Sequence, residues 1–169
     1  MAQNDRLSSA PDSPRRIRLA TEADRARLIP LINAAFAIET FLEGTRTDEE
    51  RLAGMMGKGS ILVAEDANGQ LLGCVYTEVR GKRGYLGQLA VDPVHQCKGL
   101  AIRLVAAAEE HLRGQGCEAV EITVLSLRPE LPPIYRRYGY VETGTEEFHP
   151  TQALKSGAEC HAIVMVKQL

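Results

Sequence analysis

The feature that most constrains the fold is a strand that runs through a short loop into a helix near the middle of the chain. Residues 85–91 have strand character, and residues 99–112 carry apolar side chains at helical spacing. The first N–H groups of such a helix have no partner within it, so the junction attracts anions. Gly99 and Ala101 are small enough for a phosphate to approach the backbone, and Lys98 adds positive charge. We interpret the junction as a phosphate-binding loop; the alternative is a loop that only turns the chain.

Other local patterns predict strands and helices on both sides of this junction. Asn68-Gly69 suits a tight turn and predicts a hairpin. Helices are expected to begin at Thr21, as N-cap, and at a capping box over residues 47–50. Pro30 lacks an N–H and is expected to kink or restart the first of these helices. Strands are expected at residues 16–19, 60–65, 71–79, 85–91, 118–125, 140–146 and 160–166.

The composition fits a single globular domain. Hydrophobic residues make up 44% of the 169 positions and charged residues 25%, which separates the chain from disordered sequences. The formal net charge of −2 leaves no basic field for nucleic acid or an anionic membrane. We expect residues 1–14 to form a disordered N-terminal tail without a secretory signal, and residues 15–169 to form one domain. The cysteines show no paired spacing, which favours reduced thiols in the cytoplasm and predicts no metal site.

Two motifs resemble those of the GNAT superfamily of N-acetyltransferases. Gln96-x-x-Gly99-x-Ala101 is similar to the superfamily's acetyl-CoA signature, Q/R-x-x-G-x-G/A. About forty residues further on, Ile134-Tyr135-Arg136-Arg137-Tyr138-Gly139-Tyr140 is similar to its late motif, (L/F)-Y-x-x-x-G-(F/Y). The predicted order of elements, β-α-α-β-β-β-α-β-α-β-β, also matches. The resemblance implies an α/β fold of the GNAT type, with a twisted mixed sheet of six or seven strands and helices on both faces.

The resemblance also implies where acetyl-CoA binds as the co-substrate. The strand before the loop would offer its backbone to the pantetheine arm, and its amides would polarise the thioester carbonyl in the manner of an oxyanion hole. The loop amides would cradle the pyrophosphate. The residues concerned are Leu89, Ala90 and Val91 for the pantetheine arm, and Gln96, Cys97, Lys98, Gly99, Leu100 and Ala101 for the phosphates.

The superfamily's late tyrosine maps onto Tyr135, where the resemblance implies that its hydroxyl protonates the departing CoA thiolate. A phenol has a reference pKa of about 10 and stays protonated at neutral pH, which suits this role. The alternative is an aromatic residue that only packs under the helix. The general base is less defined, because the position where some members carry Glu is Thr123 here. Glu121 on the same strand face and Glu78 on the hairpin are the candidates, unless both only face solvent.

The acceptor is the part of the function that the sequence leaves open. Glu39 and Phe41 fall in a region that often covers the acceptor site in this superfamily, although they also fit an ordinary connecting loop. Arg128 and Leu131 stand where many members carry Asn and Ala, and residues 127–131 resemble a bacterial and fungal sub-group of unassigned acceptor specificity.

From these observations we predict direct transfer of an acetyl group from acetyl-CoA to a primary amine. The amine belongs to a small molecule or a peptide, and acetylation of protein amines shares the same chemistry. The alternative is a non-catalytic module that binds and senses acyl-CoA. A homodimer is compatible with the sequence, which does not define the oligomeric state.

Overall fold

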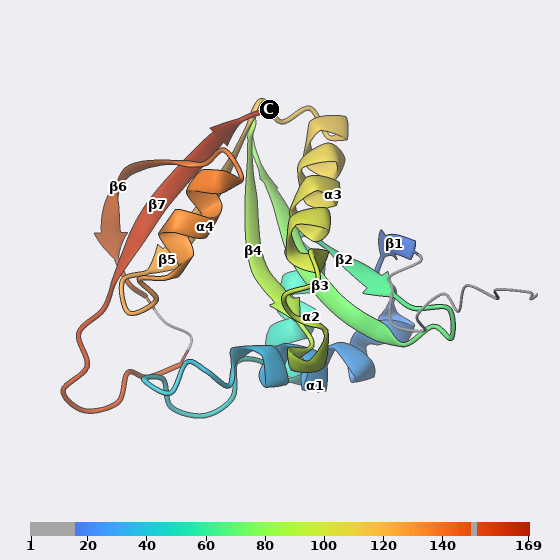
Figure 1. Cartoon of the computed structure of the whole chain (residues 1–169), viewed down its shortest axis with the longest axis horizontal. Helices are drawn as coiled ribbons and strands as arrows, with labels where there is room; N and C mark the ends of the chain where they lie inside the picture. Colours follow the sequence, from blue (N-terminus) through green and yellow to red (C-terminus); the bar gives the residue numbers. More distant parts are fainter. Residues whose placement is uncertain (1–15, 150–151) are drawn as a thin grey trace, which may run out of the picture.

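A seven-stranded mixed sheet forms the centre of the computed structural model, which describes residues 16–149 and 152–169. The strand order is β1-β2-β3-β4-β5-β7-β6 (Figure 1). Neighbouring strands are antiparallel except for β4 and β5, which are parallel. The strands are β1 (Arg16–Leu19), β2 (Ser60–Glu65), β3 (Leu71–Arg80), β4 (Arg83–Val91), β5 (Ala119–Leu125), β6 (Val141–Glu147) and β7 (His161–Gln168). The predicted mixed sheet is confirmed, while the expected tail over residues 1–14 lies outside the described residues.

The helices follow the predicted order. They are the 3₁₀ turn η1 (Glu22–Asp24), α1 (Arg25–Phe36), α2 (Glu49–Lys58), the 3₁₀ turn η2 (Pro93–His95), α3 (Leu100–Gly114) and α4 (Leu131–Arg137). Within the described part of the chain, no helix combines the length and the apolar content that crossing a membrane requires.

The starts of the first two helical segments partly correct the sequence analysis. Thr21 is the N-cap of η1, as expected. Of the two expectations for Pro30, a restart is wrong, because α1 runs through it and buries Leu28, Leu31 and Ile32, while a kink stays a prediction. The N-cap of α2 is Asp48, whose carboxylate accepts a hydrogen bond from the Arg51 N–H at 2.9 Å, and not the first residue of the predicted box.

Helices cover both faces of the sheet, as predicted, and each face has its own apolar core. Along β2, Ile61 and Val63 pack in the cluster that contains α1 and α2, whereas Leu62 and Ala64 pack in the cluster that contains α3. Tyr135 of α4 packs against the cluster on the α3 side. The period of two along a strand therefore places successive residues in opposite cores, which explains why β2 and β3 are apolar almost throughout.

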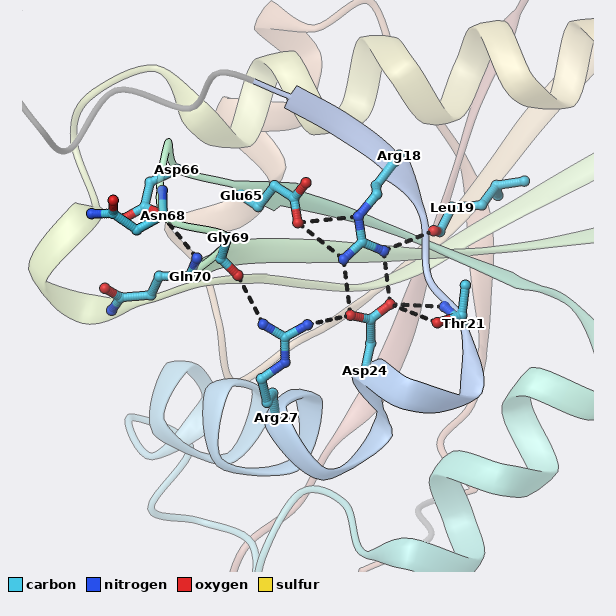
Figure 2. Close-up of polar contacts among 10 residues, drawn as sticks. All are labelled: Arg18, Leu19, Thr21, Asp24, Arg27, Glu65, Asp66, Asn68, Gly69 and Gln70. Atoms are coloured by element: carbon cyan, nitrogen blue, oxygen red, sulfur yellow. Dashed lines mark hydrogen bonds and ion pairs between the residues drawn. The ribbon is translucent and has the colours of Figure 1, made fainter.

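A cluster of four charged residues joins the start of α1 to strands β1 and β2, and we call it the anchor cluster: Arg18, Asp24, Arg27 and Glu65 (Figure 2). Arg18 donates from Nη1 and Nη2 to the two oxygens of Asp24, at 2.7 and 2.9 Å. Its Nε donates to Glu65 at 3.1 Å, and Arg27 donates to Asp24 at 2.6 Å. The Asp24 side chain is 2% exposed, so these bonds replace its solvation by water.

The turn of the β2–β3 hairpin combines the predicted Asn-Gly conformation with side-chain hydrogen bonds that the sequence analysis did not predict. Gly69 has a φ of 77°, as the Asn-Gly pair predicted. Asp66 accepts hydrogen bonds from the backbone N–H groups of Asn68 and Gln70, at 2.8 and 2.9 Å (Figure 2). The Gly69 carbonyl accepts a hydrogen bond from Arg27 at 2.8 Å, which ties the turn to α1 and the anchor cluster.

Candidate functional site

The site lies where the two parallel strands at the centre of the sheet separate. β4 and β5 pair only over residues 83–85 and 119–121, and beyond this point each strand loses the other as a partner (Figure 1). A cavity of about 950 Å³ opens between the diverging strands and extends to α1, α2, α3 and α4. This volume lies at the upper end of the range for small-molecule sites.

A bulge in β4 marks the edge of the cavity. Cys74 pairs with Ala90 and Tyr76 with Gly87, so Gln88 and Leu89 together stand opposite a single residue of β3. Gln88 has a φ of 49°, a left-handed conformation that is uncommon for residues other than glycine and persists only where the surrounding structure holds it. A bulge removes backbone groups from the strand ladder, and its two residues, Gln88 and Leu89, both line the cavity.

The loop between β4 and α3 has the geometry of an anion-binding turn. Cys97 and Gly99 both have positive φ values, 61° and 79°, and turns of this kind can direct successive backbone N–H groups at an anion. A Cβ at Gly99 would meet nothing within 4 Å, which leaves open space above the backbone. Gln96 donates from Nε2 to the Val91 carbonyl at 3.1 Å, and this bond holds the loop against the end of β4.

Most of the residues expected to bind the cofactor line this cavity. Ala90 is an exception, since its side chain is buried in the core on the α1 side. Lys98 is exposed and does not line the cavity. The expected residues that do line it are Leu89, Val91, Gln96, Cys97, Gly99, Leu100 and Ala101.

Two neighbouring tyrosines at α4 differ in how their hydroxyl groups are used. Their rings, Tyr135 and Tyr140, lie 5.8 Å apart between centroids. The Tyr140 hydroxyl donates to Glu109 at 3.0 Å, and Glu109 also accepts from Lys167 at 2.9 Å. Tyr135 lines the cavity, and its hydroxyl has no hydrogen-bond partner among the residues that the structure describes. Burial raises the pKa of Tyr135 to about 12, so the phenol carries its proton at neutral pH.

A second cluster of charged and polar residues, which we call the cavity cluster, consists of Glu39, Arg46, Gln88 and Arg128. Arg46 donates to one oxygen of Glu39 at 3.0 Å and Arg128 to the other at 2.9 Å. Arg46 also donates to the Gln88 side chain at 2.7 Å. All four residues line the cavity. The cluster joins the loop after α1, the bulge of β4 and the loop after β5, which are far apart in the sequence.

The remaining predicted residues fall into different places. Glu78 lines the cavity, where its carboxylate accepts hydrogen bonds from Tyr76 at 2.7 Å and Arg80 at 3.0 Å. Both bonds lower the pKa of Glu78, and the bond from Arg80 has the larger effect. Glu121 does not line the cavity and instead accepts from Arg83 at 2.9 Å. Phe41 does not line it either.

Sequence reasoning missed Tyr85 and Arg46, which both line the cavity. The Tyr85 hydroxyl lies 3.4 Å from the hydroxyl of Thr123, a position that the sequence analysis noted only because it lacks the glutamate of some members. Arg46 stands in a loop without a recognisable pattern, so no local signal identifies it. Among residues 16–149 and 152–169, no group of three or more His, Cys, Asp or Glu side chains is placed to hold a metal ion.

Solved structures place this architecture in the class of acetyltransferase folds. A phosphinothricin acetyltransferase from Sinorhizobium meliloti, solved in complex with acetyl-CoA, superposes with a TM-score of 0.72. The two sequences are 17% identical, and the match covers 91% of this chain and 88% of the other. At this identity the similarity concerns the fold alone.

The chain belongs to the GNAT acetyltransferase family, because residues 29–150 match the family model described as an acetyltransferase (GNAT) domain. Glucosamine 6-phosphate N-acetyltransferase 1 of Oryza sativa subsp. japonica is 34% identical over 112 residues, or 62% of this chain and 66% of the rice protein. Mycothiol acetyltransferase of Propionibacterium freudenreichii is 29% identical over 73% of this chain and 42% of its own length. The chain thus spans less than two thirds of these two curated relatives.

Proposed function

We propose that the protein transfers an acetyl group from acetyl-CoA to a primary amine by direct attack of the amine on the thioester. The observation that carries this proposal is that one cavity joins the positive-φ loop at Gly99 to the unpartnered hydroxyl of Tyr135. A module that only binds acyl-CoA needs the loop but has no use for a protonated phenol at the other end of the cavity. The second feature therefore favours an enzyme over a sensor.

Acetyl-CoA supplies the activated acetyl group, and the residues present fit it as a co-substrate. The N–H groups at the start of α3 would hold the pyrophosphate in the open space above Gly99. Leu89 and Val91 would border the pantetheine arm, and the backbone of the β4 bulge would bond to it and polarise the carbonyl. The Gln96 side-chain amide donates to the Val91 carbonyl and so holds the phosphate-binding loop against the end of β4.

Tyr135 acts as the general acid in this proposal. Its raised pKa keeps the hydroxyl protonated, and no residue within hydrogen-bonding distance in the described chain competes for that proton. A thiolate requires a proton or a hydrogen bond as it leaves, and a positioned acid supplies it. The neighbouring Tyr140 cannot take this role, because its proton is committed to Glu109.

Glu78 is the carboxylate that we assign to the acceptor amine. Each of the two candidate carboxylates is bonded to an arginine, but Glu78 lines the cavity and Glu121 does not. Its lowered pKa makes Glu78 an anion at neutral pH, which suits attraction of an ammonium group and relay of its proton through water. The acceptor belongs to the small-molecule or peptide amines; the rice relative is named for a small amino sugar phosphate.

The proposal is tested by measuring acetyl-CoA binding and CoA release in matched variants. Gly99→Glu places a side chain and a negative charge in the phosphate position and should abolish acetyl-CoA binding in calorimetry. Gly116→Glu is the control, because Gly116 also has a positive φ, 87°, and open space at the opposite end of α3. The control should lose stability without losing acetyl-CoA affinity.

Release of free CoA is then measured with acetyl-CoA and a panel of amino acids, polyamines, amino sugars and peptides. Turnover of any amine by the wild-type chain, abolished by Gly99→Glu, supports the enzyme. Firm acetyl-CoA binding without turnover across the panel would favour the binding module. Unchanged affinity in a folded Gly99→Glu protein would remove the cofactor assignment.

A further inference from the structure

The cavity cluster contains more hydrogen-bond donors than the protein uses. Arg46 donates from Nε to Gln88 and from Nη1 to Glu39. Arg128 donates from Nε to Glu130 and from Nη1 to Glu39. In the described residues, Nη2 of each guanidinium has no hydrogen-bond partner. Neither Nη2 atom is fully buried from solvent. Both Nη2 groups therefore keep accessible surface, and both arginines line the cavity.

The two guanidinium groups are held side by side. They bond to the two oxygens of one carboxylate, Glu39, whose side chain is only 5% exposed. Arg46 is further fixed by the ring of Phe36, 4.3 Å from its guanidinium carbon. Little side-chain freedom remains to be lost when a ligand binds, so the pair is preorganised.

The charges of the cluster do not balance on the cavity side. Two guanidinium groups face one carboxylate, and the partner that completes Arg128, Glu130, is half exposed and does not line the cavity. Burial lowers the pKa of Arg46, and the nearby charge of Arg128 adds to this effect. An anion between the two arginines would offset both costs.

We infer that Arg46 and Arg128 form an anion subsite for the acceptor, so that the substrate is an amine that also carries a carboxylate or a phosphate. Planar guanidinium groups bind these anions with paired N–H donors, which a carboxylate and a phosphate both accept. The inference rests on the proposed acetyl transfer, because it assigns the acceptor of that same cavity.

The subsite lies beside the reacting end of the cavity. Arg128 is close enough to Tyr135 for its charge to influence the pKa of the phenol, and Tyr85 influences the pKa of both Arg46 and Tyr135. The amine and the anionic group of one acceptor would therefore occupy the same cavity. Glu78, at the same cavity, takes the ammonium end.

The test uses pairs of acceptors that differ only in the anionic group. Glycine is compared with glycinamide, and phosphoethanolamine with ethanolamine, each with acetyl-CoA and the full chain. The ratio of kcat/KM within a pair is measured for the wild-type chain and for Arg128→Gln, which leaves Glu39 bonded to Arg46. We expect the preference for the anionic member of at least one pair to fall by roughly 10- to 100-fold, which corresponds to about 1.4–2.8 kcal/mol. The pair that responds distinguishes a carboxylate from a phosphate.

Arg113→Gln is the matched control, since it removes an exposed arginine of α3 that does not line the cavity. It should leave both ratios unchanged. Arg128→Lys keeps the charge but loses the paired donors and should fall between Arg128→Gln and the wild type. A tenfold loss of acetyl-CoA affinity in Arg128→Gln would assign the arginines to the cofactor and overturn the inference. Unchanged ratios in both pairs would also overturn it while leaving acetyl transfer intact.

A binding measurement separates this inference from the proposed function. Inorganic phosphate and sodium acetate are titrated into the ¹⁵N-labelled chain, and the Nε–Hε signals of Arg46 and Arg128 are followed by NMR. Saturable shifts of both signals, lost in Arg128→Gln for Arg46, support the subsite even if no amine is acetylated. Signals that do not move at 20 mM of either anion, a concentration of about 10⁻² M at which weak sites are occupied, would overturn it.

Discussion

The anchor cluster and the cavity cluster have nearly the same parts and opposite uses. Each places a buried carboxylate, Asp24 or Glu39, between two arginines. In the anchor cluster all three side-chain nitrogens of Arg18 have partners, and a second carboxylate balances the charge (Figure 2). Arg27 keeps Nε without a partner in the described residues, but its half-exposed side chain does not line the cavity. In the cavity cluster each arginine has one such nitrogen within the described part of the chain, both arginines line the cavity, and the balancing carboxylate, Glu130, does not.

The difference teaches how to separate structural from functional polar groups in this fold. A buried charge whose hydrogen bonds all end inside the protein stabilises a local arrangement, whereas one with donors left over at a cavity can bind a ligand. Tyr140 and Tyr135 repeat the contrast, because the Tyr140 hydroxyl donates to Glu109 and the Tyr135 hydroxyl has no hydrogen-bond partner in the described chain. Variants in matched pairs can break or sharpen this comparison.

The largest expected effect is on the tyrosines. Tyr135→Phe keeps the ring and its packing but removes the acid, so kcat should fall by roughly 10²–10⁴, or about 3–5 kcal/mol, with unchanged stability and acetyl-CoA affinity. Tyr140→Phe should show the opposite pattern, with a loss of about 1–3 kcal/mol in unfolding free energy and nearly normal kcat. Steady-state kinetics and urea unfolding on both variants check this. A kcat for Tyr135→Phe within about threefold of the wild type contradicts the acid role.

The next effect concerns the anchor cluster. Asp24→Ala removes a buried carboxylate that holds two arginines, and we expect a loss of about 3 kcal/mol in unfolding free energy, the lower end for breaking a buried pair, because Arg18 retains Glu65. Glu22→Ala, which removes an exposed partner of Arg25, is the control and should cost less than about 1 kcal/mol. The kcat of the folded fraction should not change in either variant. A loss of kcat in Asp24→Ala would mean that the anchor cluster reaches the site.

The anchor cluster's contribution to the free energy of unfolding should decrease at acid pH. The hydrogen bonds from Arg18 hold the pKa of Asp24 far below its usual range. A carboxyl with a depressed pKa stabilises the folded state above its unfolded pKa of about 3.9, and this stabilisation is lost as the pH falls through the folded value. The stability difference between the wild type and Asp24→Asn should therefore be constant from pH 7 to 5 and shrink below about pH 4. A difference that stays constant down to pH 2.5 would contradict it.

The elements that the sequence predicted well depend on chemistry between near neighbours. The turn at Asn68-Gly69, the N-cap at Thr21 and the helix start after Gly99 each follow from a backbone angle or bond within a few residues. Where two neighbouring residues compete for one role the prediction slipped, as at Asp48, which caps α2 in place of the residue before it.

The residues of the cavity cluster could not be found in this way, because they meet only through the folded sheet. Glu39 and Arg128 are 89 positions apart, and Arg46 and Gln88 are 42 apart. Glu121 shows the converse: its strand and face were predicted, but its partner Arg83 comes from the neighbouring parallel strand, 38 positions away, and no local pattern reports that pairing.

The smallest expected effect distinguishes an open cluster from a closed one. Glu39→Gln leaves the guanidinium groups of Arg46 and Arg128 side by side without a carboxylate. We expect the free energy of unfolding to fall by about 1–2 kcal/mol, a modest loss because water in the cavity solvates the two groups. Inorganic phosphate should then restore Tm by mass action, more in this variant than in the wild type. Asp24→Asn should gain less, since Arg18 keeps Glu65 and Arg27 keeps the Gly69 carbonyl as partners, and it corrects for the general effect of the salt. Equal rescue of the two variants by phosphate would mean that both clusters are structural and that the comparison between them fails.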